Sequence, residues 1–218
     1  MNRNFPFVVG EFYHLYNRGV NKMPIFNNDT DRKHFLFLLY ICNGTNAFQS
    51  REIKNASFHK MERGDRLIDI GAYCLMGNHF HIMARERVEK GISRFMGKLG
   101  TAYTMYFNKK NGRTGSLFES RFKAKHIDND PYFNWVFSYI HMNPVAFIEP
   151  EWKEGIANIH AVKDFLEEYK WSSYIDHFVG KREESVILNK EDFPDSFVLA
   201  ESFEELFLDF NENKLSTP

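Results

Sequence analysis

A pair of strand-like stretches joined by Gly77 and Asn78 constrains the fold of this chain more than any other feature. Residues 67–76 and residues 79–84 are both rich in residues that favour strands, and only the short Gly-Asn segment separates them. A Gly-Asn pair between two such stretches is typical of a β-hairpin. Because strands joined by so short a turn run antiparallel, we expect an antiparallel sheet.

The rest of the chain alternates between further strands and helices. Residues 11–17 and 116–128 have strand character, whereas residues 31–41, 93–108 and 130–143 have helical character. Asp29 or Thr30 can cap the first of these helices and Asp130 the third, while Pro144 prevents the third from continuing. The order strand, helix, strand, strand, helix, strand, helix predicts an α+β, ferredoxin-like fold, with helices on one face of the antiparallel sheet.

The character of the chain changes after Pro150. Helical periodicity returns at residues 161–169 and, for a turn or two, at residues 172–178. Residues 181–218 carry ten acidic and four basic side chains. We therefore expect one domain over residues 1–150 and a helical C-terminal extension with an acidic tail over residues 151–218.

Composition excludes several classes of protein. Hydrophobic residues make up 43% and charged residues 26% of the chain, as in globular proteins rather than disordered, collagenous or coiled-coil chains. Cys42 and Cys74 are too few for a disulfide framework or a four-thiolate zinc site. The sequence shows neither a secretory signal nor an apolar stretch near the ~20 residues of a membrane helix. We therefore expect a cytoplasmic protein that does not contact membranes.

Basic residues gather in the middle of the chain although the net charge is only −1. Residues 91–126 hold eight basic side chains and one acidic one, Glu119. Such a run is as often a solvated face as a binding surface. With an acidic tail to balance it, the same run is also typical of a surface that binds a polyanion.

His79 and His81 form the sharpest local motif. Residues i and i+2 of a strand point to the same face, so the two imidazoles lie side by side and Phe80 points to the opposite face. Two neutral imidazoles at this spacing can chelate a divalent cation. A bare His-x-His is short and common, however, and two purely structural histidines are its more frequent outcome.

Tyr139 and Asn143 form a second motif, on a predicted helix. At positions i and i+4 they share one helix face, a turn apart. An asparagine oxygen is a hard ligand suited to Mg²⁺ or Mn²⁺, and a tyrosine hydroxyl is a potential nucleophile. Taken alone, a core tyrosine and a polar residue at a helix end explain the pair better.

Together the two motifs fit one mechanism. Two imidazoles and an amide oxygen leave positions on a cation for phosphate oxygens, and the cation favours the phenolate of Tyr139 and withdraws charge from a phosphodiester. Attack by Tyr139 gives a phosphotyrosine ester, which keeps the energy of the broken bond for rejoining. A cation that activated water instead would give simple hydrolysis.

In these motifs the chain resembles the single-tyrosine HUH transposases of insertion sequences and, among them, the REP-associated tyrosine transposases. The family's motif is a His-hydrophobic-His strand followed by a tyrosine on a later helix, here His79-Phe80-His81 and Tyr139. The likeness extends from the start of the chain to about Val179. The blocks that carry it lie at residues 13–19 (YHLYNRG), 24–26 (PIF), 31–32 (DR), 72–81 (AYCLMGNHFH), 115–123 (GSLFESRFK), 139–145 (YIHMNPV) and 171–174 (WSSY).

The resemblance implies a DNA transposase, an enzyme that nicks and transfers strands. It makes His79, His81 and Asn143 the metal ligands and Tyr139 the nucleophile. It also implies Mg²⁺ or Mn²⁺ as cofactor, single-stranded DNA with foldback hairpins as substrate, and 5′-phosphotyrosine intermediates. Both a monomer and a homodimer with shared active sites are consistent with it.

Basic side chains on or near the predicted strand at residues 116–128 are candidates for DNA contact. Each phosphate that they neutralise adds affinity through counterion release. Aromatic rings in the same region (Tyr103, Tyr106, Phe118 and Phe122) can stack on bases, although we expect most of them in the core. Histidines 14, 34, 59, 126, 141, 160 and 177 have no comparable partner spacing and are expected to be structural or exposed. The DNA-contact candidates are Arg18, Arg113, Arg121, Lys123 and Lys125.

Two other functions stay open. A domesticated, non-catalytic nucleic-acid-binding protein would use the basic and aromatic surface alone, but it would not need both histidines together with Tyr139 and Asn143. A metal-dependent phosphodiesterase that uses water would cleave DNA without Tyr139.

Overall fold

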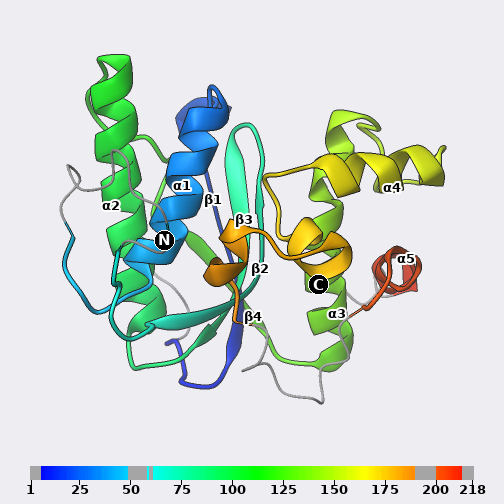
Figure 1. Ribbon diagram of the computed structural model, residues 1–218, viewed down its shortest axis with the longest axis horizontal. Helices are drawn as coiled ribbons and strands as arrows, with labels where there is room; N and C mark the ends of the chain where they lie inside the picture. Colours follow the sequence, from blue (N-terminus) through cyan, green and yellow to red (C-terminus); the bar gives the residue numbers. More distant parts are fainter. Residues whose placement is uncertain (1–5, 49–57, 59–60, 190–199, 213–218) are drawn as a thin grey trace.

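A four-stranded antiparallel sheet lies at the centre of the computed structural model, which describes residues 6–48, 58, 61–189 and 200–212 (Figure 1). Its strands are β1 (Phe12–Arg18), β2 (Ile68–Leu75), β3 (His79–Glu86) and β4 (Lys123–Ile127). They lie in the order β2-β3-β1-β4, and every neighbouring pair is antiparallel. The predicted β2–β3 hairpin is present, and the ferredoxin-like α+β fold is confirmed.

Helices cover both faces of this sheet, not one face as the sequence led us to expect. Helices α1 (Asp29–Cys42) and α2 (Gly91–Asn111) lie on one face, and α3 (Asp130–Met142) lies on the other (Figure 1). Strand β1 shows why: Tyr13 and Leu15 enter the core beneath α1 and α2, whereas Phe12 packs on Phe133 of α3. A sheet with apolar side chains on both faces must be covered twice. We call the two sides the α1/α2 face and the α3 face.

Strand β2 contains a bulge that exchanges its two faces. The register with β3 shifts between Ile70 and Ala72. Before the bulge, Ile68 and Ile70 point to the α1/α2 face, and after it Tyr73 and Leu75 do so. An extra residue in one strand produces this change of alternation.

Several element ends differ from the predicted ones. Strand β4 occupies only Lys123–Ile127 of the predicted 116–128. Helix α1 is capped by Asn28 rather than by Asp29 or Thr30, and α3 is capped by Asn129 rather than by Asp130. Helix α3 ends at Met142, just before Pro144, as predicted. A 3₁₀ segment, η4 (Asn143–Phe147), follows directly, since proline is tolerated in a first helical turn.

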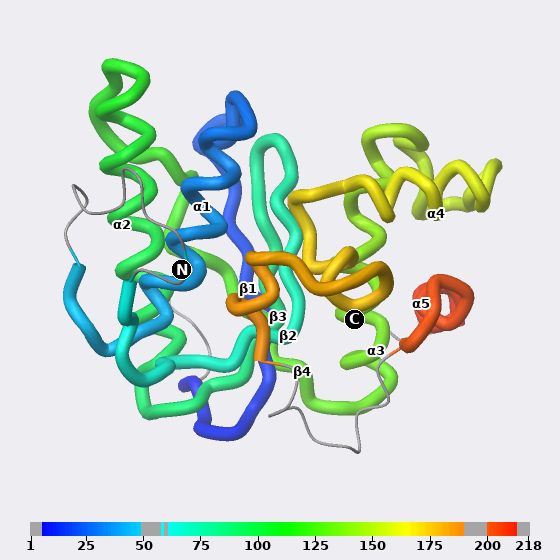
Figure 2. Tube along the Cα trace, viewed as in Figure 1, coloured from blue at the N-terminus to red at the C-terminus, as the bar shows by residue number. Residues whose placement is uncertain are grey.

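The described residues after 150 pack on α3, on α1 and along the free edge of β2. The elements of this part are α4 (Ile159–Glu168), the π-helical turn η5 (Ile175–Val179), the 3₁₀ turn η6 (Glu183–Ile187) and α5 (Phe203–Glu212). Near the start of the chain, a short 3₁₀ turn, η1 (Val20–Lys22), precedes α1. The backbone of Trp171 and Ser173 pairs with Leu75 and Tyr73, which covers the outer edge of β2. Figure 2 traces the segment that contains η5 and η6, in orange, from α3 towards α1. None of the described helices combines the length and apolar character that a membrane crossing requires.

Candidate active site

His79 and His81 lie at the start of β3, next to the turn that joins it to β2, and their side chains point to the α3 face. Their ring centroids are 5.0 Å apart and nearly perpendicular. Phe80, between them, points to the α1/α2 face, where its ring lies 5.0 Å from that of Phe35. The predicted alternation of these three side chains is therefore confirmed.

Tyr139 and Asn143 lie one turn apart at the C-terminal end of α3. Asn143 is the residue that ends the helix, and only 5% of it is exposed. Its Nδ2 donates to the Tyr139 carbonyl oxygen at 2.6 Å, which leaves Oδ1 as the atom that can accept or ligate. Tyr139 is half-buried.

The packing of α3 on the sheet brings the two motifs together within one chain. The ring centroids of Tyr139 and His81 are 5.5 Å apart, at an interplanar angle of 84°. His79 adjoins His81 on β3, and Asn143 lies one turn beyond Tyr139 on α3, with its amide bonded to the Tyr139 backbone.

His14 also belongs to this group, which corrects our expectation that it is merely structural or exposed. Its Nε2 lies 2.8 Å from Nδ1 of His81, and its ring centroid lies 6.1 Å from that of Tyr139. His14 escaped notice because its partner is on another strand. Alternation along β1 places His14 on the same face as Tyr16, but the pairing of Tyr16 with His81 depends on strand register, which the sequence does not give.

Burial keeps the three imidazoles neutral at neutral pH. Desolvation, followed by the charge of Lys125, lowers the pKa of His14 to about 3. The pKa of His79 is lowered to about 4, first by desolvation and then by the nearby charges of Arg18 and Lys153. Desolvation also holds the pKa of His81 well below its usual range. Neutral imidazoles keep the lone pairs that a metal ion needs.

The donor atoms of the site fit a divalent cation. Nε2 of His81 is buried and has no hydrogen-bond partner among the described residues. Nδ1 of His79 is bonded to Asn78, which leaves its Nε2 as the second nitrogen, and Oδ1 of Asn143 adds an oxygen. No cluster of three or more His, Cys, Asp or Glu side chains in the described part of the chain is arranged to hold a metal. The donors that the described residues offer a cation here are the two imidazoles and the amide oxygen.

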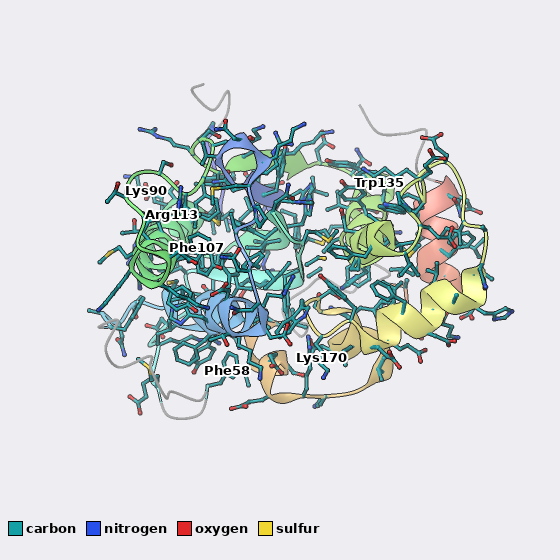
Figure 3. The ribbon with its side chains drawn as sticks, turned by 90° about the horizontal axis from the view of Figure 1, so that it is seen from above. Phe58, Lys90, Phe107, Arg113, Trp135 and Lys170 are labelled. Carbon is teal, nitrogen blue, oxygen red and sulfur yellow. The ribbon has the colours of Figure 1, made fainter. Side chains whose placement is uncertain are left out.

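Lys153 and two indoles surround Tyr139. The Lys153 ammonium nitrogen lies 3.4 Å from Tyr139 Oη and 5.0 Å from the centroid of its ring. Trp135, one turn earlier on α3 and labelled in Figure 3, stacks on Tyr139 at 4.8 Å. Trp152 lies 6.1 Å from the same ring, and Phe210 of α5 stacks on Trp152 at 4.8 Å. The sequence had not singled out Lys153, which follows α3 by a turn and a loop.

The DNA-contact candidates divide into those near the imidazoles and those elsewhere. Lys125 lies 4.7 Å over the ring of Tyr132 on the α3 face, and Lys123 alternates to the same side of β4. Arg18 ends β1 beside His79 and is paired with Glu119 at 3.0 Å, while Arg121 is exposed just before β4. Arg113 follows α2 in the opposite layer, and Figure 3 shows it on the far side of the molecule from Trp135.

The aromatic candidates for base stacking are mainly core residues, as expected. Tyr103 and Phe118 are buried on the α1/α2 face, and Tyr106 is half-buried against His34. Tyr132, the other tyrosine of α3, is also buried, and desolvation raises its pKa.

Comparisons with known proteins identify the family and support the fold. The sequence model of the IS200-like transposase family matches residues 13–143, more than half of the chain and a range that contains His14, His79, His81, Tyr139 and Asn143. Comparison with curated proteins gives no match. Among solved structures, the chain is similar to a REP-associated tyrosine transposase bound to a REP hairpin, with a TM-score of 0.50 and 13% identity over 81% of this chain and 84% of that one. A likeness to the tRNA(His) guanylyltransferase of Saccharomyces cerevisiae, with a TM-score of 0.31 and 10% identity over 90% of this chain and 86% of that one, is too low to carry an argument.

Proposed function

Because this chain belongs to the family of IS200-like transposases, we propose that it cleaves and rejoins single-stranded DNA with Tyr139 as the nucleophile. The resemblance read from the sequence is confirmed at the level of the family, and the protein is a transposase. One observation carries the proposed chemistry. The ring of Tyr139 lies 5.5 Å from that of His81, and His79 and Asn143, the other proposed donors to a cation, are next to these two residues.

The proposed reaction has two steps. In the first, the hydroxyl oxygen of Tyr139 bonds to the phosphorus of a DNA phosphodiester, and the bond from phosphorus to the 3′ oxygen breaks. The phenol proton leaves to solvent, and the departing 3′ oxygen takes up a proton to become a hydroxyl. In the second, the 3′ hydroxyl of another DNA end attacks the 5′-phosphotyrosine ester, which restores the phenol and joins the two segments.

His79, His81 and Asn143 are the proposed ligands of Mg²⁺ or Mn²⁺. The buried, unpartnered Nε2 of His81 supports this assignment, because a nitrogen in that state needs a partner that the described residues do not supply. A divalent cation bound there would polarise the phosphodiester as a Lewis acid.

Besides the cation, a side chain of the protein, Lys153, favours attack by Tyr139. Its ammonium lies 3.4 Å from the phenol oxygen, where a positive charge stabilises the negative charge that develops as the proton leaves. Trp135 stacks on the ring at 4.8 Å and limits movement of the side chain about its Cα–Cβ bond, which keeps the phenol oxygen in place.

The proposed substrate is single-stranded DNA that contains a hairpin. A solved structure of similar fold is bound to a REP hairpin. Arg18 ends β1, the strand next to the imidazoles of β3, and Lys123 and Lys125 lie on β4, on the other side of β1. These cations would neutralise backbone phosphates and hold the strand across the site.

A labelled oligonucleotide that folds into a hairpin, with randomised single-stranded flanks, tests the proposal. Incubated with Mn²⁺, the full-length protein is expected to form a protein–DNA adduct that survives denaturation. Tyr139→Phe is expected to form none, and Tyr132→Phe, which alters a buried tyrosine of the same helix, is expected to form it still. The label must remain with the protein when it lies 3′ of the cleaved bond and be released when it lies 5′ of it.

Two results would replace this proposal with the alternatives. Salt-sensitive binding of the oligonucleotide without cleavage in either Mg²⁺ or Mn²⁺ would indicate a non-catalytic DNA-binding protein. Cleavage that persists in Tyr139→Phe, without any adduct, would indicate a phosphodiesterase that uses water.

A further inference from the structure

Both proposed histidine ligands are held at their Nδ1 atoms. Nδ1 of His79 lies 2.6 Å from Oδ1 of Asn78, and Nδ1 of His81 lies 2.8 Å from Nε2 of His14. The Asn78 amide is fixed in turn, since its Nδ2 donates to the carbonyl oxygen of Lys22 at 3.0 Å. Its Oδ1 can only accept, so His79 carries its proton on Nδ1 and keeps a lone pair on Nε2.

The contact between His14 and His81 allows two positions for the shared proton. If Nε2 of His14 donates, then His81 carries its own proton on Nε2, a buried atom with no acceptor among the described residues. If Nδ1 of His81 donates, Nε2 of His81 holds only an unpaired lone pair. A buried N–H without an acceptor costs more free energy, and is rarer, than a buried nitrogen lone pair without a donor. The geometry therefore favours donation by Nδ1 of His81 to Nε2 of His14.

We propose that His14 is a positioning residue that accepts the Nδ1 proton of His81 and thereby directs the Nε2 lone pair of His81 towards the cation. The inference rests on the proposed function, because it gives that lone pair its ligand. It makes His14 the counterpart of Asn78: each proposed histidine ligand has one partner that fixes its tautomer and ring orientation.

The placement of His14 suits such a role. It sits on β1, the strand next to β3, and lies diagonally across from His81 with ring centroids 5.0 Å apart. Only 6% of it is exposed, so water does not compete for the contact. Both rings are therefore fixed by a two-strand ladder rather than by a loop.

The tautomer of His81 can be measured without metal or DNA. In metal-free, full-length protein labelled with ¹⁵N-histidine at neutral pH, long-range ¹H–¹⁵N correlation is expected to show His81 protonated on Nδ1. His14→Leu removes the acceptor and is expected to move His81 towards the Nε2-protonated form. His14→Gln offers an amide oxygen in place of Nε2 and is expected to retain the Nδ1 form.

Affinity for Mn²⁺, titrated by electron paramagnetic resonance in the absence of DNA, gives a second readout. His14→Leu is expected to weaken Mn²⁺ binding by about 10- to 100-fold, whereas His14→Gln recovers most of the loss. His126→Gln is the matched control, since it alters a histidine of the adjoining strand β4 that is bonded to Glu11, and it is expected to bind Mn²⁺ as the wild type does.

The outcomes separate this inference from the proposed function. His81 protonated on Nε2 in the wild type, or a His14→Leu variant with unchanged tautomer and unchanged Mn²⁺ affinity, would overturn the role of His14. A wild-type protein that shows the Nδ1 tautomer but fails to bind Mn²⁺ would overturn the purpose assigned to His14 and the proposed metal site, and the adduct test of Tyr139 would still stand. Should His14→Leu fail to fold, the wild-type tautomer and His14→Gln decide the matter.

Discussion

The two faces of the sheet are built from the same strands, but one is an apolar core and the other contains a cluster of polar side chains. On the α1/α2 face, Phe80 and Tyr103 lie in a continuous apolar core, and the hydroxyl of Tyr103 is bonded to the Ile25 carbonyl. On the α3 face, apolar contacts such as Phe12 with Phe133 give way, towards the start of β3, to imidazoles that face Tyr139. The α1/α2 face therefore contributes mainly to stability. The α3 face contains polar side chains close together where apolar packing would stabilise the fold more.

The largest contrast is expected between adjacent residues of β3. His81→Ala removes a proposed ligand and is expected to lower the rate of adduct formation by about a thousandfold or more. The reason is that the proposed ligands act together, so that the loss of one removes the contribution of the whole metal site. Phe80→Ala empties a core site on the other face and is expected to lower the free energy of unfolding by about 3–5 kcal/mol.

Single-turnover adduct assays and urea denaturation of both variants check this pair. His81→Ala should remain folded under conditions that unfold Phe80→Ala. If His81→Ala proved the less stable of the two, the division of labour between the faces would be wrong.

A smaller effect is expected from the charge beside Tyr139. Lys153→Met removes the ammonium that lies 3.4 Å from the phenol oxygen and is expected to slow adduct formation by about tenfold, a modest loss because Lys153 is exposed to water. Lys153→Arg keeps the charge and should be slowed less. Lys163→Met serves as the control, because it removes a cation of α4 that pairs with Glu204 and should not affect the rate. Equal rates for Lys153→Met and the wild type would show that the phenol does not depend on this cation.

Acid stability tests the histidine of the opposite layer. His34 of α1 stacks on Tyr106 with ring centroids 3.7 Å apart, and desolvation lowers its pKa to about 4. An unfolded histidine binds a proton near pH 6.5 while the folded one does not, so stability is complete above this pH and falls as the pH drops towards 4. The His34→Gln variant is therefore expected to lose less free energy of unfolding than the wild type as the pH falls. We expect a difference of only about 1 kcal/mol, because His34 is half-buried and water screens its charge.

Denaturant titrations at several pH values, each compared with the wild type, measure this difference. The rate of DNA cleavage at neutral pH should be the same in His34→Gln and in the wild type. A variant that retained the acid sensitivity but cleaved slowly would place His34 with the site rather than with the core.

The smallest effect is expected at the rim of the α3 face. Arg18 pairs with Glu119 at 3.0 Å, and this contact lowers the pKa of Glu119. Glu119→Gln should release Arg18 for a DNA phosphate, raise the affinity for single-stranded DNA by about two- to threefold and steepen the salt dependence by about 0.7 in log–log slope. Affinity measured over a range of salt concentrations checks this, and Arg18→Gln should shift both quantities the opposite way.

Much of the site follows from local spacing alone. The period of two in β3 places His79 and His81 together and separates them from Phe80, and the period of 3.6 in α3 places Tyr139 above Asn143. Both relations depend only on the type of element, so they could be predicted without knowing how the elements pack.

What escaped prediction depends on long-range register. His14 reaches His81 because β1 pairs with β3 in one register among several, and Lys153 reaches Tyr139 because the chain folds back after η4. The covering of both faces escaped for a similar reason. The alternation of Phe12 with Tyr13 shows apolar side chains on both sides of β1, but it does not say which helix covers each side.

The bulge between Ile70 and Ala72 has a consequence for how the gene of such a protein can change. Downstream of it, Tyr73 keeps its place beneath α1 and α2 only because the strand is one residue longer than its partner there. Point substitutions along β2 would alter one contact each. Deletion of a single codon at this position would turn Ala72, Tyr73 and Cys74 over together. We therefore expect descendants of this sequence to vary in composition along β2 while conserving its length.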